Sequence, residues 1–152
     1  LEQFASPDDI YNRPRSRFVA GFMGSPPMNF LPGKVRADGH FIDLGVDVAL
    51  PVPVALAGVA AARAGKDIVI GLRPEHVTLS SQDNEATAIP AEIELLEPLG
   101  SETLALLRLG GLTLTGRFSP DAGLKVGDRP RLALSLAHLS LFEPESGAKL
   151  SP

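Results

Sequence analysis

The segment Arg73–His76 brings together three side chains that could take part in chemistry. Arg73 supplies a guanidinium, Glu75 a carboxylate and His76 an imidazole, directly after an apolar run. Pro74 fixes its own φ at about −65°, so the same residues also suit a turn in which Glu75 pairs with Arg73 or caps the backbone that follows. Two interpretations stay open: an interface or regulatory loop, and a structural turn.

A second polar segment, Gly100–Thr103, is a candidate loop of the same kind. Gly100 permits a tight bend, and a hydroxyl such as that of Ser101 can bind nearby backbone groups. Backbone N–H groups in such a loop can also hold an oxyanion, provided that the carboxylate of Glu102 points away. Either loop could therefore face a small ligand or another subunit.

The sequence contains no catalytic or metal-binding signature. It has no phosphate-cradling G-x-x-x-x-G-K-[ST] loop, no G-x-G-x-x-G after a strand and no G-x-S-x-G elbow. Cysteine is absent, and His40, His76 and His138 share no metal-ligand spacing. We therefore expect no catalytic residue, no cofactor, no metal and no binding of ATP by this chain alone.

The composition is that of a globular domain. Its 152 residues suit one domain or two small packed halves. A net charge of −4, a single Tyr and no Trp argue against a nucleic-acid partner, which needs clustered cations and stacking rings. No apolar run reaches the roughly 18 residues that cross a bilayer, and no signal peptide is visible. We expect a cytoplasmic location, and because the chain starts at Leu1 without a start signal, part of a longer protein.

Residues 1–25 are predicted to be helical and distinct from the rest. Ser6 suits a helix cap, since proline follows it and acidic residues occupy the first turn. Residues 15–24 form a second predicted helix with an apolar stripe at i, i+4 spacing. That stripe either covers the core of its own domain or docks on a partner domain. The residues expected at such docking are Phe18, Phe22, Met23, Met28 and Phe30.

Period-two alternation begins after Pro26 and Pro27, where we place the domain boundary. Asp38 and Gly39 predict a two-residue hairpin turn. The other expected elements are a strand at 42–50, a short Ala-rich helix at 55–64, strands at 67–72, 89–96, 103–109, 112–118 and 131–136, a linker at 80–87, and fraying from residue 143 onward.

An internal repeat relates the two halves of the chain beyond this boundary. Gly65 and His76 align, at a shift of 62, with Gly127 and His138. Alternation alone can match apolar positions, whereas shared glycine and histidine positions favour a true repeat. We predict two five-stranded units, each closing its own sheet edges. The predicted units are about 28–80 and 87–143.

Three separated motifs resemble one protein family over essentially the whole chain. They are the N-terminal motif (Tyr11–Pro14 with Arg17–Leu31), Gly71–His76 and Leu99–Thr103. In this order they resemble the C-terminal part of the ATPase subunit of maltose-type ABC importers, which take up sugars and glycerol-3-phosphate. The resemblance implies that residues 1–25 end a nucleotide-binding domain. It also implies that residues 26–152 are a mainly β regulatory domain of tandem OB-like (transport-associated OB, TOBE) barrels.

The resemblance implies a regulatory and dimerisation role without chemistry in this segment. In the family, the regulatory domains of two ATPase subunits contact each other, and some members receive inhibitory proteins or small effectors. The implied partners are a second copy, the chain's own nucleotide-binding domain and regulatory proteins. ATP and magnesium would be bound upstream, outside this sequence. Contact with the inner face of the membrane would be indirect, through permease subunits.

Two other classes of function remain as alternatives. Related barrels bind oxyanions such as molybdate, so a small-ligand sensor is the first. An OB-type barrel that binds single-stranded nucleic acid is the second, and the negative net charge and scarce aromatic residues disfavour it.

Overall fold

Short apolar runs divided by glycine and proline fold here into short antiparallel strands. The computed structural model describes residues 3–22, 26–81 and 88–152, which are mainly β. The helices are α1 (Pro7–Asn12), α2 (Arg17–Phe22) and α3 (Ala57–Ala62), with 3-10 turns η1 (Val54–Leu56), η2 (Pro74–His76), η3 (Pro120–Ala122) and η4 (Leu136–His138). Among the helices described, none is long and apolar enough to cross a membrane.

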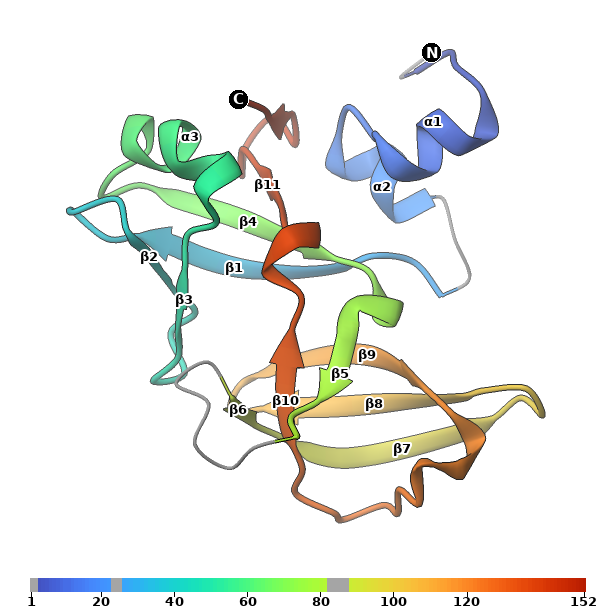
Figure 1. The fold of residues 1–152 in the computed structure, drawn as a ribbon. Coiled ribbons are helices and arrows are strands. Elements are labelled where there is room, and N and C mark those ends of the chain that lie inside the picture. Colours follow the sequence, from blue (N-terminus) through green and yellow to red (C-terminus); the bar gives the residue numbers. More distant parts are fainter. Residues whose placement is uncertain (1–2, 23–25, 82–87) are drawn as a thin grey trace.

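The strands form three hydrogen-bonded sheets, drawn in Figure 1. The first has the order β12-β11-β4-β1-β2-β3, the second β5-β10-β6 and the third β7-β8-β9. The strands are β1 (Asn29–Val35), β2 (Phe41–Asp43), β3 (Ala49–Pro51), β4 (Asp67–Leu72), β5 (Val77–Leu79), β6 (Ile89–Pro90), β7 (Glu92–Pro98), β8 (Thr103–Leu109), β9 (Leu112–Phe118), β10 (Arg131–Leu134), β11 (Ser140–Phe142) and β12 (Lys149–Leu150).

The two predicted halves exchange strands instead of each closing its own edges. After η2, β5 leaves the first half and pairs with β10 of the second, with Leu79 opposite Leu132. After η4, β11 returns to the first half and pairs with β4, with Leu141 opposite Ile70. Each 3-10 turn redirects the chain, so the open edge of β4 is covered by a strand from the other half. The expectation of self-contained units was wrong on this point.

One apolar core runs through both halves. Leu31, Ile70 and Leu72 of the first half lie in the same buried cluster as Leu107 and Leu132 of the second. A polar bridge adds to this junction: the side chain of Asn29 accepts a hydrogen bond from the backbone N–H of Thr115 (2.7 Å) and donates one to its carbonyl (2.8 Å). These two hydrogen bonds join β1 to β9 in the way that backbone hydrogen bonds join two paired strands.

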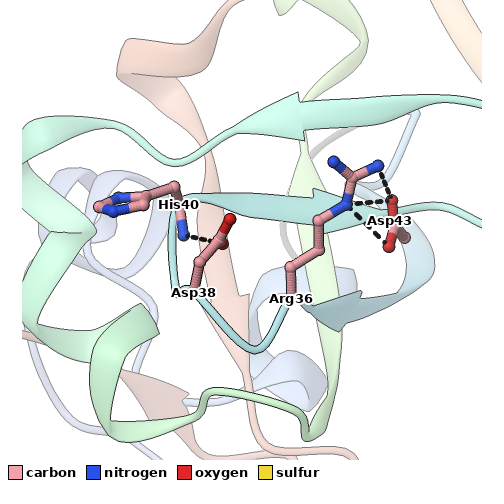
Figure 2. A network of polar contacts seen from close by, with 4 residues as sticks. All are labelled: Arg36, Asp38, His40 and Asp43. Atoms are coloured by element: carbon pink, nitrogen blue, oxygen red, sulfur yellow. Dashed lines mark hydrogen bonds and ion pairs between the residues drawn. The ribbon is translucent and has the colours of Figure 1, made fainter.

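The hairpin predicted at Asp38 and Gly39 joins β1 to β2, and Figure 2 shows its polar contacts. Gly39 has φ +74°, a conformation that glycine adopts without strain. Asp38 accepts a hydrogen bond from the backbone N–H of His40 (2.8 Å), and Arg36 pairs with Asp43 at 2.8 Å. The backbone N–H of Arg36 donates to the carbonyl of Phe41 (2.9 Å). The turn between the two strands is therefore longer than the two residues predicted.

The single strand predicted at 42–50 is two strands, β2 and β3, with Ile42 opposite Leu50. Gly45 (φ +75°) and Asp47 (φ +58°) reverse the chain between them. The alternation is the same on either side of such a turn, so periodicity could not reveal it. The predicted Ala-rich helix, in contrast, is confirmed as η1 followed by α3.

The C-terminal residues predicted to fray are ordered as far as Leu150. Lys149 and Leu150 form β12 against β11, and Ala148 forms an isolated bridge with Ser16. Glu143 stabilises the intervening turn by accepting a hydrogen bond from the backbone N–H of Ser146. The segment between α1 and α2 is therefore held beside the C-terminal strands, as Figure 1 shows.

Candidate functional site

The loop after β4 is fixed to the N-terminal helices through Tyr11. Arg73, only 4% exposed, donates a hydrogen bond from Nη2 to the carbonyl of Tyr11 (2.6 Å). Its guanidinium carbon also lies 3.7 Å from the centre of the Tyr11 ring. The Tyr11 hydroxyl donates to Glu75 Oε1. Two of the predicted loop residues thus meet on one tyrosine of α1; we call this group the tyrosine clamp.

The clamp shifts the titration of both hydrogen-bonding groups. Burial raises the pKa of Tyr11, and the hydrogen bond to the Glu75 carboxylate raises it further. Burial alone would raise the pKa of Glu75, but the bond from Tyr11 and the positive charges of His76 and Arg117 outweigh it, so that pKa is lowered. Glu75 is therefore ionised and Tyr11 neutral at pH 7, which favours this donor and acceptor.

His76 and His138, the equivalent residues of the internal repeat, stack on each other. Their ring centres are 3.9 Å apart and their planes differ by 11°. Ser135 holds the pair, since its backbone N–H donates to the His76 carbonyl (3.0 Å) and its Oγ lies 2.7 Å from His138 Nδ1. Burial lowers the pKa of His76, and the neighbouring His138 lowers it further. Within the described part of the chain, the buried Nδ1 of His76 has no hydrogen-bond partner.

A pocket of about 210 Å³ opens beside these two rings, and we call it the histidine pocket. It lies between the α1–α2 segment, η2, η4 and β12. Its lining residues are Tyr11, Asn12, Pro14, Met28, Arg73, His76, Ala137, His138, Leu139, Ser140 and Lys149. Sequence reasoning missed Lys149 as a site residue because the residues from Glu143 onward were expected to fray, and it noted Ser140 only as a position of the internal repeat. The repeat could have pointed to His138, as the partner of His76.

The second predicted loop, Gly100–Thr103, is the turn between β7 and β8. Gly100 has φ +86°, and the Leu99 N–H donates to the Glu102 carbonyl (2.8 Å). The Glu102 carboxylate pairs with Arg117 of β9 at 2.9 Å, while Ser101 is exposed. Because the charge of Arg117 also lowers the pKa of Glu75, the structure brings both loops close to the same cation.

The residues predicted to dock on a partner domain divide into two groups. Met28 is buried and Phe30 half-buried, and both pack in a cluster of their own chain with Ala20, Val69 and Phe142. Phe30 meets the Phe142 ring edge-on at 5.7 Å. These two side chains therefore cover their own sheet.

Phe18 lies on the outer side of α2 and is 68% exposed. It lines an open groove of about 580 Å³, together with Phe30 and the loop around Gly147. Met23 and the side chain of Phe22 lie outside the described residues. Docking on a partner domain stays a prediction, and Phe18 is the residue placed to serve it.

Two further surface features bear on function. Among the residues that the structure describes, no group of three His, Cys, Asp or Glu side chains could hold a metal ion. Exposed apolar side chains gather near β7, at the edge of its sheet. They are Leu95 (59% exposed), Leu99 (48%) and Val126 (62%), the last beside β7 because the Gly127 N–H donates to the Ile93 carbonyl. We call this group the β7 patch.

Comparison with known proteins supplies the family. Residues 24–77 match the MalK OB fold domain, and residues 70–142 match the TOBE domain. The chain is 38% identical to the sn-glycerol-3-phosphate import ATP-binding protein UgpC of Pectobacterium atrosepticum, over 98% of this chain and 40% of that protein. It is 40% identical to the UgpC protein of Chromohalobacter salexigens, over 94% of this chain and 37% of that protein. The chain thus spans about 40% of the length of these curated relatives.

A solved structure adds a likeness of fold. The cytoplasmic molybdate-binding protein ModG, with molybdate bound, is similar with a TM-score of 0.63, covering 74% of this chain and 94% of that chain. The sequence identity is 21%, so this likeness concerns the fold alone. The two domain matches together span residues 24–142, and relatives match nearly the whole chain. The chain belongs to the MalK-type OB and TOBE domains that form the C-terminal regulatory part of ABC importer ATP-binding subunits.

Proposed function

We propose that this chain is a non-catalytic contact module of an importer ATPase for glycerol-3-phosphate, sugars or related solutes. It contacts a second copy of itself and the nucleotide-binding domain of its own subunit, and it receives regulatory proteins. ATP and magnesium belong to that other domain, and the whole subunit works at the cytoplasmic face of the membrane beside permease subunits. The importer class is supported by the relatives at 38% and 40% identity, which are sn-glycerol-3-phosphate import ATP-binding proteins.

One observation carries this proposal: hydrogen bonds and ring contacts attach the helical segment that precedes the OB fold to the β body. The tyrosine clamp joins α1 to η2, and the bridge between Ser16 and Ala148 joins the same segment to the C-terminal strands. A movement that reaches α1 and α2 from another domain is therefore passed to both halves of the β body. That is the behaviour expected of a module that relays motion without doing chemistry.

The β7 patch is the surface that we assign to the second copy. Exposed apolar side chains at the edge of a sheet favour association, because contact with a second copy removes their apolar area from water. We expect sedimentation velocity to show self-association that grows with concentration, and Leu95→Glu to weaken it. Val54→Glu is the matched control, since Val54 is 94% exposed and lies outside the patch, in η1. A strictly monomeric profile at high concentration would contradict the self-contact.

A separate experiment tests the proposal that the chain has no catalytic activity. The purified chain, given ATP and magnesium, is expected to release no phosphate above the rate without protein. Hydrolysis by the chain alone would overturn the proposal. An oxyanion at the Gly100–Thr103 turn would have to share Arg117 with the Glu102 carboxylate, which already pairs with it.

A further inference from the structure

The stacked histidine rings join the two turns at which the chain passes from one half to the other. His76 is the last residue of η2, and β5 follows it directly. His138 is the last residue of η4, and β11 begins two residues later, at Ser140. The ring centres lie 3.9 Å apart and the planes differ by 11°. One side-chain contact therefore holds together both turns that lead into the exchanged strands.

The geometry of the pair suits a response to protons and not a shared metal ion. The lone pair of an imidazole nitrogen lies in the plane of its ring, so two parallel rings cannot direct nitrogens at one ion. Two protonated rings, in contrast, would hold like charges face to face at 3.9 Å. Histidine is also the side chain whose ordinary pKa lies closest to physiological pH. The contact therefore favours neutral rings.

His76 is poorly placed to carry a second ring proton. Its Nδ1 is buried and has no hydrogen-bond partner within the described ranges 3–22, 26–81 and 88–152. Protonation makes both ring nitrogens donors, and a buried donor without an acceptor is unfavourable. Burial lowers the pKa of His76, and the positive charges of His138 and Arg73 lower it further.

The charged and titratable groups around His76 come from several elements. They are Arg73 and Glu75 beside it in the chain, His138 on η4, Tyr11 on α1, Arg117 on β9 and Lys149 on β12. Glu75 is the one acid among them, and its charge favours a protonated His76. The same carboxylate accepts the hydrogen bond from the Tyr11 hydroxyl. A protonated His76 and the Tyr11 hydroxyl therefore compete for Glu75.

We propose that the stacked histidines make the attachment of the helical segment sensitive to pH. When acid charges the pair, the rings repel each other, and the Glu75 carboxylate is drawn from the Tyr11 hydroxyl to His76. The tyrosine clamp is then weakened while the apolar core stays closed. This device rests on the clamp and on the ring stack, and it does not depend on contact with a second copy.

The direction of the pH effect follows from the lowered pKa of His76. In the unfolded chain that histidine titrates near its ordinary value. The neutral pair therefore contributes stability that is complete above this value and is lost as the pH falls below it. The pKa of Glu75 is lowered as well, from a value already far below that of histidine. A change between about pH 7.5 and about pH 5.5 therefore belongs to histidine.

Tyr11 itself is the probe for the clamp. The chain has one tyrosine and no tryptophan, so its tyrosine fluorescence reports on Tyr11 alone. A carboxylate that accepts a hydrogen bond from a tyrosine hydroxyl quenches the emission of that ring. We expect the emission to rise as the pH falls from about 7.5 to about 5.5, along with the titration of the His76 imidazole signals in NMR spectra. Emission that stays flat through this range would overturn the proposal.

Variants show whether the histidine pair causes the rise. His76→Asn and Glu75→Gln should each abolish it, whereas His138→Asn should move its midpoint to higher pH, because a positive neighbour of His76 is removed. His40→Asn is the matched control, since His40 is exposed in the turn between β1 and β2, and it should match the unaltered chain. Should His76→Asn fail to fold, His138→Asn still decides at an exposed position. A rise that persists in His76→Asn, or an unmoved midpoint in His138→Asn, would contradict the proposal.

Discussion

Tyr11 links two parts of the chain through three different interactions. Its carbonyl accepts from Arg73, its ring lies under the same guanidinium, and its hydroxyl donates to Glu75. Arg73 is almost fully buried, and a buried guanidinium is tolerated only when its donors and its charge are compensated. Tyr11 supplies much of that compensation from a short helix that has no buried residue of its own.

We predict that Tyr11→Phe destabilises the chain by roughly 1–3 kcal/mol, because it leaves the half-buried Glu75 carboxylate without its donor while keeping the ring beneath Arg73. Urea unfolding of Tyr11→Phe, Glu75→Gln and the double variant gives the coupling between the two side chains. We expect a clear coupling energy. Strictly additive effects would show that the hydrogen bond contributes nothing to stability.

The sequence identified these residues only in part. The order Arg73, Pro74, Glu75, His76 marked a polar loop after a buried strand, and the structure places the loop there. Tyr11 lies more than sixty positions earlier, and no periodicity connects it with that loop. His138 was visible as a repeat partner of His76, but a shift of 62 residues does not say that the two rings touch. Such contacts depend on how distant elements meet in the folded chain.

At the scale of elements, β4 is the strand on which the others converge. It pairs with β1 on one side and β11 on the other, and the apolar cluster under α2 covers one face of it. Gly71 lies at the closest approach. A Cβ placed there would come 2.5 Å from Met28 Sδ and 2.6 Å from the ring of Phe142. Any side chain at this position would therefore force Met28 and Phe142 to shift within their buried cluster.

We predict that Gly71→Ala destabilises the chain by about 1–3 kcal/mol through overpacking of this cluster. Gly58→Ala in α3 is the matched control, because its new Cβ would meet no atom within 4 Å. Alanine favours helix over glycine, so that variant should be neutral or more stable by up to about 1 kcal/mol. Thermal unfolding of both variants measures the difference. Equal stabilities would contradict the close approach at Gly71.

The helices and strands also show which features the sequence pattern could predict and which it could not. Strands β4, β8 and β9 were predicted within a residue of their bounds, because each is a continuous apolar or alternating run closed by glycine, proline or a polar turn. The split of residues 42–50 was missed because a reversal at Gly45 and Asp47 keeps the same alternation. The sequence did not predict that β12 is an ordered strand, because β12 is stabilised by its pairing with β11 and not by its own residues.

For the whole molecule, the strand exchange decides how the chain can be divided. The repeat suggested units at about 28–80 and 87–143, and the limits of these units stay a prediction. Each would lack a strand that completes its sheet: β11 in the first case and β5 in the second. The common core also crosses the junction, so the separation of either half would expose apolar side chains such as Leu72 and Leu132.

We therefore predict that residues 1–81 and residues 82–152, produced separately, each lack a cooperative unfolding transition, and that an equimolar mixture recovers one. Amide NMR spectra report this directly, through dispersed signals in the mixture and collapsed signals in each part. A well-dispersed spectrum and a sharp urea transition from residues 1–81 alone would contradict the prediction. The intact chain, with its covalent connection, is the reference for the recovered spectrum.

The return of β11 to β4 also has a consequence for synthesis on the ribosome. The emerging chain makes β1 to β4 early, yet the outer edge of β4 finds its neighbour only when nearly everything that follows has been translated. During that interval a strand with open backbone groups and apolar neighbours is exposed to other nascent chains. Slow translation of the second half is therefore expected to cause more aggregation, and a greater need for chaperones, than slow translation of the first half.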